Sequence, residues 1–456
     1  MHGTHITQTT INSRYVCYTE TYADISPLRE VGSRSAFVSI MRGCNNMCSF
    51  CIVPFTRGRE RSRAMSSILN EIKILVNDDE APLREVCLLG QNVNGYHDAS
   101  SESSILYPAS TYKTAAGFSN LFNSKARDLP GARFSDLLVA VSQLSPELRV
   151  RFTSPHPKDF SDDVLNEIAN RPNLCKSLHL PVQSGSSSML QRMRRGYSRE
   201  AYLDLVYRAR RIIPGVSIST DVISGFCGET EEEHKDTVSL MKQVKFDQAF
   251  MFSYSLREKT HAAHNLKDDI PEEVKLVRLQ EVIDAFHGSI QDTNRDLEFG
   301  KLRLVLCEGP SNRSLRDDPQ LTGRTDTNKR VVFPAGPLLK SLKSELLPSL
   351  LQVLEKANEF NIAKSGEIHG TKMKSAFSAF EAELNAASKD CNDIVSNSME
   401  AAPGNYVLCR IVEANGPTLR AVAISLSSME EYNQYNKAKE ERERERKRKE
   451  MMTGLI

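Results

Sequence analysis

Three cysteines lie close together in the first part of the chain, with the spacing C-x-x-x-C-x-x-C. They are Cys44, Cys48 and Cys51, in the segment RGCNNMCSFC that begins at Arg42. Cysteine thiolates bind iron–sulfur clusters, and a four-iron cluster normally takes four of them. Three thiolates leave one iron with an open coordination position, as a catalytic zinc keeps one. The triplet therefore predicts one [4Fe-4S] cluster whose open iron can bind a small molecule directly.

A zinc site is the first alternative for the triplet, with His97 or His156 as a fourth ligand. A buried group of unpaired cysteines explains the tight spacing less well, because cysteines recur at such intervals mainly to bind something. The remaining cysteines of the ten are scattered along the chain. A disulfide framework is typical of short secreted chains, so a reducing compartment is expected instead.

The composition is that of an ordinary globular chain that can bury a core. Its 456 residues are 40% hydrophobic and 26% charged, and the formal net charge is +1. A chain of this length holds two or three domains at roughly 150 residues each. No apolar stretch approaches the roughly 20 residues that a membrane span requires, so no membrane partner is expected. With so small a net charge, nucleic-acid binding must come from local basic patches.

The elements that must position the triplet alternate short β-branched runs with longer helical runs. This pattern predicts a core at 35–298 with six strand–helix units, beginning with a strand over 36–41. Such an alternation is typical of a parallel α/β sheet or barrel. In a barrel, functional residues lie in loops at the carboxyl ends of the strands. The triplet follows the first strand, so we expect it at the mouth of the barrel.

The rest of the chain predicts a second, smaller domain and several additions. Short strands separated by turns over 299–426 indicate a small all-β barrel. We expect a flexible insertion at 98–131 and a helical insertion at 338–398 that splits the small barrel. The charged tail at 427–456 is expected to be a solvated helix or disordered. Residues 1–34 are polar and are expected to form a linker.

The cysteine segment, from Arg42 to Arg63, resembles the cluster segment of MiaB-type tRNA methylthiotransferases. Further matching segments follow in the family's order, and they are LLGQNV at 88–93, RFTSPHPK at 151–158, LHLPVQSG at 178–185, RRGYSRE at 194–200 and DVISGFCGET at 221–230. Cys227, where bacterial members usually have proline, and the segment 267–275 resemble the eukaryotic branch. That branch is named for association with a regulatory subunit of a cyclin-dependent kinase.

The resemblance implies a radical S-adenosylmethionine (SAM) enzyme, with a partial (β/α)6 barrel followed by a TRAM module that binds tRNA. The family's reaction is methylthiolation of C2 of N6-isopentenyladenosine next to the anticodon. It implies one [4Fe-4S] cluster, SAM on the open iron, an electron donor, and tRNA as partner. One electron cleaves SAM to a deoxyadenosyl radical, which removes hydrogen from the aromatic C–H. The cofactors carry this chemistry, and the protein supplies binding and exclusion of water.

Family members also carry an N-terminal domain with three more cysteines. These hold a second [4Fe-4S] cluster that serves sulfur insertion. In this sequence only Cys17 precedes the triplet, so the chain as given does not support the second cluster. Because the downstream motifs are all present, we expect a truncated chain that begins at the linker, where TETYAD at 19–24 matches. The triplet then accounts for the radical but not for the sulfur.

Residues at the strand ends are expected, by resemblance, to bind SAM. They are Gln91 and Asn92 for the amino group, His179 and Gln183 near the ribose, Asp221 and Gly225 around the adenine, and Glu229. Each has a structural alternative. Gln91 and Asn92 suit a turn with polar caps, a lone histidine near a strand is often structural, and Glu229 suits a helix N-terminus. Cys227 is expected only to pack.

Four arginines follow the triplet at every second position. They are Arg57, Arg59, Arg61 and Arg63. In an extended chain they would share one face close to the site, where they would bind tRNA phosphates. The alternative is a solvated loop in which they pair with Glu60.

Two other functions remain open from the sequence. A close variant is the branch of the superfamily that acts on threonylcarbamoyl-adenosine or the branch that acts on a ribosomal protein. A different class is a regulatory protein that binds a kinase activator, with the helical insertion 338–398 and the charged tail as the surface for a protein partner. The intact cysteines favour an enzyme. The eukaryotic branch suggests mitochondria, with the cytoplasm as the alternative.

Overall fold

Six parallel strands form the centre of the larger domain. The computed structural model describes residues 32–108, 114–119, 129–338 and 399–452. The strands pair as two three-stranded sheets, with orders β1-β4-β7 and β8-β9-β10. They are β1 (Ser35–Ser39), β4 (Glu85–Leu89), β7 (Arg149–Phe152), β8 (Ser177–His179), β9 (Ser217–Ser224) and β10 (Gln248–Ser253). A parallel bridge between Val150 and Leu174 links the two sheets beside β8. The sheets thus form a partial barrel, and β1 and β10 are its two free edges.

The alternation of side chains explains why these segments are strands. In β1, Ala36 and Val38 are buried, whereas Phe37 points to the inside of the partial barrel. Successive residues of a strand face opposite sides, and the outer side of a parallel sheet is covered by helices. Leu88 of β4 and Ile218 of β9 are buried in the same way in one continuous core. The apolar outward positions therefore fix the register and leave the inner positions for other roles.

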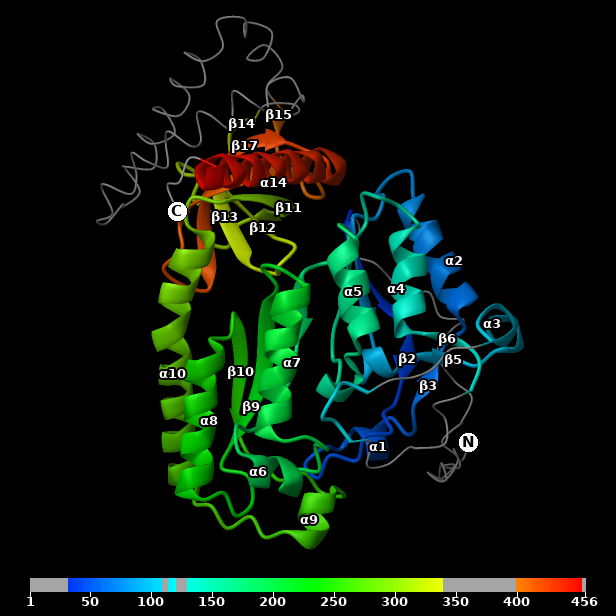
Figure 1. Cartoon of the computed structure of the whole chain (residues 1–456), viewed down its shortest axis with the longest axis vertical. Coiled ribbons are helices and arrows are strands. Elements are labelled where there is room, and N and C mark those ends of the chain that lie inside the picture. The colour runs from blue at the N-terminus through cyan, green and yellow to red at the C-terminus, as the bar shows by residue number, and fades with distance from the viewer. Residues whose placement is uncertain (1–31, 109–113, 120–128, 339–398, 453–456) are drawn as a thin grey trace, which may run out of the picture.

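Helices pack around the outside of the strands (Figure 1). The longer ones are α2 (Met65–Val76), α4 (Phe134–Ser142), α5 (Asp162–Asn170), α7 (Arg199–Ile212), α8 (Glu231–Val244) and α10 (Glu272–Glu298). Their buried faces carry the helical spacing, as Ile68 and Ile72 of α2 show. A capping box formed by Thr230 and Glu233 begins α8, as expected for such a pair at a helix start. Shorter helices are α1 (Val53–Thr56), α3 (Ser101–Leu106), α6 (Ser187–Arg192) and α9 (His261–Asn265).

The second domain is a closed barrel with the order β11-β12-β13-β17-β16. Its strands are β11 (Leu302–Pro310), β12 (Gln320–Arg324), β13 (Arg330–Pro334), β16 (Tyr406–Glu413) and β17 (Thr418–Leu426). The predicted fold class, a partial α/β barrel followed by a small β-barrel, is confirmed. Strand β12 was not expected, because its sequence QLTGR is largely polar. Gly323 allows this strand to approach β11, since a Cβ there would overlap the carbonyl oxygen of Leu306.

The predicted additions are described in part. The 98–131 insertion contains α3, and its two ends meet where β5 (His97–Asp98) pairs with β6 (Ala132–Arg133). The helical insertion lies outside the described residues, apart from Leu338. The tail forms α14 (Met429–Met452), whose first residue donates its backbone N–H to the Glu147 carboxylate at 3.1 Å. In the part of the chain that is described, no helix has the length and apolarity needed to cross a membrane.

Buried charged side chains join the two barrels. The guanidinium of Arg149 donates to the carbonyls of Arg324 and Leu304 at 2.8 and 2.6 Å and lies 5.0 Å from the centre of the Tyr406 ring. Lys329, in the turn between β12 and β13, pairs with Asp247 at 2.9 Å. Because Arg149 begins β7 and Asp247 precedes β10, the small barrel sits on the amino ends of the larger barrel's strands.

Candidate metal centre

The cysteine triplet lies in a loop at the carboxyl end of the larger barrel. The loop follows β1 and the short strand β2 (Met41–Arg42) and leads into α1, at the end away from the small barrel (Figure 1). Cys44 and Cys48 are buried and Cys51 is half-buried. The backbone at Gly43 has φ +77°, and a Cβ there would overlap the Arg59 carbonyl. Glycine is therefore needed immediately before the first predicted ligand.

Two of the three sulfur atoms accept hydrogen bonds from nitrogen. Arg195 Nη1 donates to Cys48 Sγ at 3.2 Å, and the backbone N–H of Asn46 donates to Cys44 Sγ at 3.4 Å. Arg195 is itself buried and also donates to the Pro181 carbonyl at 2.7 Å. Burial raises the pKa of the Cys44 thiol to about 12, and burial also raises the pKa of Cys51. Coordination by a metal favours the thiolate and would act against this effect.

The arrangement fits an iron–sulfur cluster better than a single ion. Within the described residues, no three His, Cys, Asp or Glu side chains gather as the ligands of one metal ion do. A four-iron cluster has a different requirement, because each thiolate binds a separate iron. The two histidines considered as a fourth zinc ligand have other partners. His97 contacts the Pro130 carbonyl at 3.0 Å, and His156 accepts from the Lys158 N–H at 3.2 Å. The cysteines as cluster ligands stay a prediction.

The turn that follows β4 contains Gln91 and Asn92 and forms hydrogen bonds with the cysteine loop. Gln91 Oε1 accepts the backbone N–H of Gly43 at 2.6 Å. Asn92 Nδ2 donates to Asp159 at 3.1 Å and to Glu60 at 3.3 Å. The structure thus shows Gln91 and Asn92 engaged with the loop and with two carboxyls, and their expected contact with the SAM amino group stays a prediction.

Glu60 gives this corner a dependence on pH. Burial raises its pKa from 4.5 to about 7, so the folded protein holds this proton more tightly than the unfolded chain does. The contribution to stability is therefore complete below about pH 4.5 and is lost as the pH rises through about 7. Glu60→Gln removes this titration. The thermal midpoint of wild type minus that of the variant should therefore decrease as the pH is raised from 5 to 8. An anaerobic melting series of the apoprotein measures it.

The control for this prediction is Glu80→Gln, at an exposed position. The difference in thermal midpoint between wild type and this variant should stay constant over the same pH range. A difference for Glu60→Gln that is equally constant would contradict the prediction.

Two predicted cofactor residues line the inside of the partial barrel together. His179 Nε2 lies 3.3 Å from Asp221 Oδ2, and its Nδ1 lies 2.9 Å from Ser219 Oγ. Gln183 is buried, has φ +75°, and its backbone N–H donates to the Asp221 carbonyl at 2.8 Å. The structure brings these three residues together on neighbouring strands, and their contact with SAM stays a prediction.

Gly225 and Glu229 form a supporting turn at the end of β9. Gly225 has φ +75°, and a Cβ there would overlap the side chain of Lys275. Its N–H donates to Glu229 Oε2 at 2.8 Å, and Arg278 Nη1 lies 3.1 Å from the same oxygen. Side chains of α10 therefore contact both Gly225 and Glu229, a packing that no local pattern in the sequence predicts.

One of the four arginines is corrected by the structure. Arg63 is 4% exposed, pairs with Glu71 at 2.7 Å and donates to the Ser39 carbonyl at 2.8 Å. It is therefore held inside the fold and is not available to a phosphate. Arg57 and Arg59 are exposed and Arg61 is half-buried, so these three stay candidates for tRNA binding. The sequence analysis did not single out Arg195, although it lies within the matching segment RRGYSRE.

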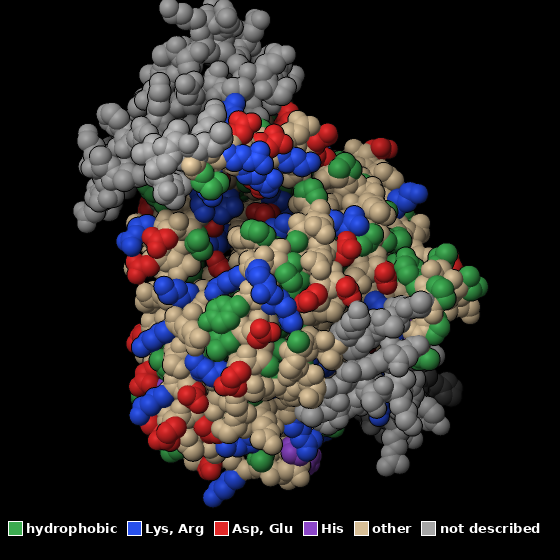
Figure 2. Space-filling view, in the orientation of Figure 1, with side chains coloured by type: hydrophobic (Ala, Val, Ile, Leu, Met, Phe, Trp, Pro, Cys, Tyr) green, Lys and Arg blue, Asp and Glu red, His purple; other side chains and the backbone are tan. Residues whose placement is uncertain are grey.

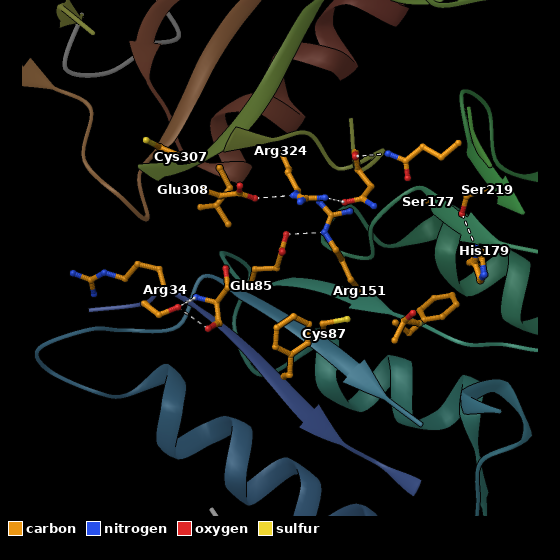
Figure 3. Close-up of a pocket in the computed structure, with 18 of the residues that line it drawn as sticks. Arg34, Glu85, Cys87, Arg151, Ser177, His179, Ser219, Cys307, Glu308 and Arg324 are labelled. Carbon is orange, nitrogen blue, oxygen red and sulfur yellow. Dashed lines mark hydrogen bonds and ion pairs between the residues drawn. The ribbon is translucent and has the colours of Figure 1, made fainter. Parts of the chain in front are cut away.

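A hollow separates the cysteine end of the molecule from the small barrel. It is a cavity of about 970 Å³, lined by all six strands of the partial barrel and by residues of the small barrel. His179 and Asp221 line it, together with Arg151 and Glu85 (Figure 3). Its volume is in the range of small-molecule sites.

Comparison with known proteins identifies the class of the larger domain. Residues 38–241 match the family model of the radical SAM superfamily. This segment includes the cysteine loop and most of the partial barrel. The chain therefore contains a radical SAM domain.

Three curated relatives are similar to the chain over both the larger domain and part of the remaining sequence. The chain is 54% identical over 316 residues to mitochondrial tRNA methylthiotransferase CDK5RAP1 of Mus musculus, covering 69% of this chain and 52% of that protein. It is 53% identical over 327 residues to the Homo sapiens protein of the same name, covering 69% and 53%. It is 48% identical over 319 residues to tRNA-2-methylthio-N(6)-dimethylallyladenosine synthase of Prosthecochloris aestuarii, covering 70% and 64%. By sequence, the chain is similar to these three proteins over about 70% of its own length. It spans about half the length of the mammalian relatives.

Proposed function

We propose that the protein is a radical SAM methylthiotransferase that converts N6-isopentenyladenosine next to the tRNA anticodon to its 2-methylthio derivative. The observation that carries this proposal is the loop of three cysteines at the carboxyl end of a partial barrel, with an arginine on the Cys48 sulfur. The printed names of the relatives support this activity over kinase-activator binding and over threonylcarbamoyl-adenosine as substrate.

The residues have separate roles in this proposal. Cys44, Cys48 and Cys51 would hold a [4Fe-4S] cluster that leaves one iron for SAM. With cluster and SAM bound, this site would supply the deoxyadenosyl radical that removes hydrogen from C2 of the adenine. The sulfur and the methyl group of the product would have to come from donors other than this radical. Arg195 positions Cys48, and Gln91 fixes the loop through the N–H of Gly43.

The partners follow from the same proposal. The substrate is tRNA, and a reductant must supply one electron. Arg57 and Arg59 are exposed beside the cysteine loop, and Lys and Arg side chains gather at α14 and the small barrel on the face shown in Figure 2. Phosphates bind such basic surfaces. The names of the mammalian relatives support a mitochondrial location.

Mass spectrometry of tRNA from cells that lack the gene tests the function. We expect the 2-methylthio derivative to disappear and N6-isopentenyladenosine to accumulate, because the preceding modification is made by another enzyme. Expression of the wild-type gene should restore the derivative, and the Cys48→Ala gene should not. Unchanged 2-methylthio modification in the deletion cells would contradict the proposed function.

A further inference from the structure

Large aromatic side chains face the hollow without being covered. Phe37 of β1 is 65% exposed and Phe250 of β10 is 51% exposed, and both line the cavity. Phe252, two residues along β10 and on the same side of the strand, is 56% exposed. We call these three residues the aromatic wall. Exposed apolar groups gathered in a concave site are a sign of a ligand.

The aromatic wall stands at the opening of the barrel. β1 and β10 are the end strands of their sheets, and each pairs with one neighbour only. Phe37 and Phe250 therefore lie on the two edge strands that border the opening of the partial barrel, and both line the hollow. Their strand neighbours do not share this exposure, since Val38 is buried and Met251 packs against the core. The exposure thus belongs to the inner face of the barrel.

Two of the three arginines that line the hollow form ion pairs within the protein. Three arginines and three carboxylates line the hollow. Arg151 pairs with Glu85 at 2.8 Å, and Arg324 pairs with Glu308 at 2.9 Å, as Figure 3 shows. Arg151 is also engaged by the carbonyls of Thr325 and Asp326.

Asp221 faces His179 at 3.3 Å. The third arginine, Arg34, directly precedes β1 and packs against Gly404 of the small barrel. The inner faces of the edge strands β1 and β10 therefore offer aromatic surface, whereas Arg151 and Arg324 are paired with carboxylates.

We propose that the aromatic wall selects the neutral prenyl substituent on N6 of the adenosine, and so distinguishes prenylated tRNA from tRNA with an unmodified or an acidic substituent. This inference rests on the proposed function. An isopentenyl group is branched and apolar, so its transfer from water to the apolar surface of Phe37 and Phe250 is favourable in free energy. A threonylcarbamoyl group carries a carboxylate. Contact with these rings would remove water from that carboxylate without giving it a hydrogen-bond donor, which costs free energy.

Binding of anticodon stem–loop RNAs to the full chain tests the inference. The RNAs carry adenosine, N6-isopentenyladenosine or N6-threonylcarbamoyladenosine at the same position, and fluorescence anisotropy gives each dissociation constant. Wild type should bind the prenylated RNA at least about tenfold more tightly than the unmodified RNA, as expected for an apolar group in a fitting pocket. The threonylcarbamoyl RNA should bind no more tightly than the unmodified one.

The variant Phe37→Ala/Phe250→Ala should reduce the preference for the prenylated RNA to about twofold or less, because little apolar surface remains. Its affinity for the unmodified RNA should be unchanged, which a merely structural effect would not produce. Phe37→Leu/Phe250→Leu should keep most of the preference. Tyr207→Ala, which removes an aromatic ring of similar exposure (48%) from the outer helix α7, is the matched control and should keep all of it.

Two outcomes would overturn the inference. One is an alanine double variant that retains the wild-type preference. The other is a wild-type protein without that preference, or one that prefers the threonylcarbamoyl RNA. Neither outcome changes the deletion-cell experiment, which judges the proposed function separately by the loss of 2-methylthio modification.

Discussion

Cys48→Ala is expected to abolish cluster assembly and SAM cleavage together. Wild type reconstituted anaerobically with iron and sulfide should bind about four irons per chain. The variant should bind almost none, because two thiolates cannot hold the cluster, and it should form no 5′-deoxyadenosine after reduction. Iron and sulfide analysis, electron paramagnetic resonance and product chromatography measure these results.

The matched control is Cys409→Ala, which removes a buried thiol from β16 of the small barrel. It should retain the full iron content and the wild-type rate of SAM cleavage. SAM cleavage by Cys48→Ala at the wild-type rate would overturn the ligand assignment.

Lys329→Met is expected to destabilise the protein by about 3–5 kcal/mol, because it leaves the buried carboxylate of Asp247 without its cation. Lys329 Nζ lies 2.9 Å from Asp247 and 3.1 Å from Glu298, and all three side chains are at most 6% exposed. Glu298 keeps Arg303 at 2.7 Å as a second partner. Asp247 keeps only the backbone N–H of Ile218 among its contacts in the described residues. Urea unfolding of the apoprotein measures the loss.

Lys235→Met provides the comparison for the buried lysine. Lys235 and Glu231 form an exposed pair at 3.7 Å on α8, with side chains 69% and 54% exposed. Its removal should cost below about 1 kcal/mol, because water screens the pair. If the two lysine variants unfold at the same urea concentration, the buried network does not stabilise the junction.

The sequence predicted the larger barrel well, because its strands and helices have strong periodic patterns. The strand expected over 36–41 is β1, from Ser35 to Ser39, followed closely by the short strand β2. β12 was missed since its polar residues carry no strand pattern. Only its pairing with β11 and β13 makes it a strand.

The site was predictable where local spacing determines it. The triplet needs only a loop after a strand, and the structure places it there. The arginine series failed at Arg63 because the expectation assumed one extended segment. The chain instead turns at Gly58, with φ +78°, and then enters β3 (Arg61–Ser62), after which Arg63 turns inward.

Contacts between distant parts of the chain could not be predicted. Arg195 reaches Cys48 across 147 positions of sequence, and Arg278 reaches Glu229 across 49. No periodicity or spacing records such a meeting. These partners became visible only when the strands had placed the loops beside each other.

The buried links at Arg149 and Lys329 also determine how the two ends of the molecule behave as a unit. They tie the small barrel to the amino ends of the strands, while the cysteine loop lies at the opposite ends. A bend at this junction would have to strip buried charges of their partners. The distance between the small barrel and the cysteine loop is therefore fixed. An RNA bound by the small barrel would meet the cysteine loop at a constant separation.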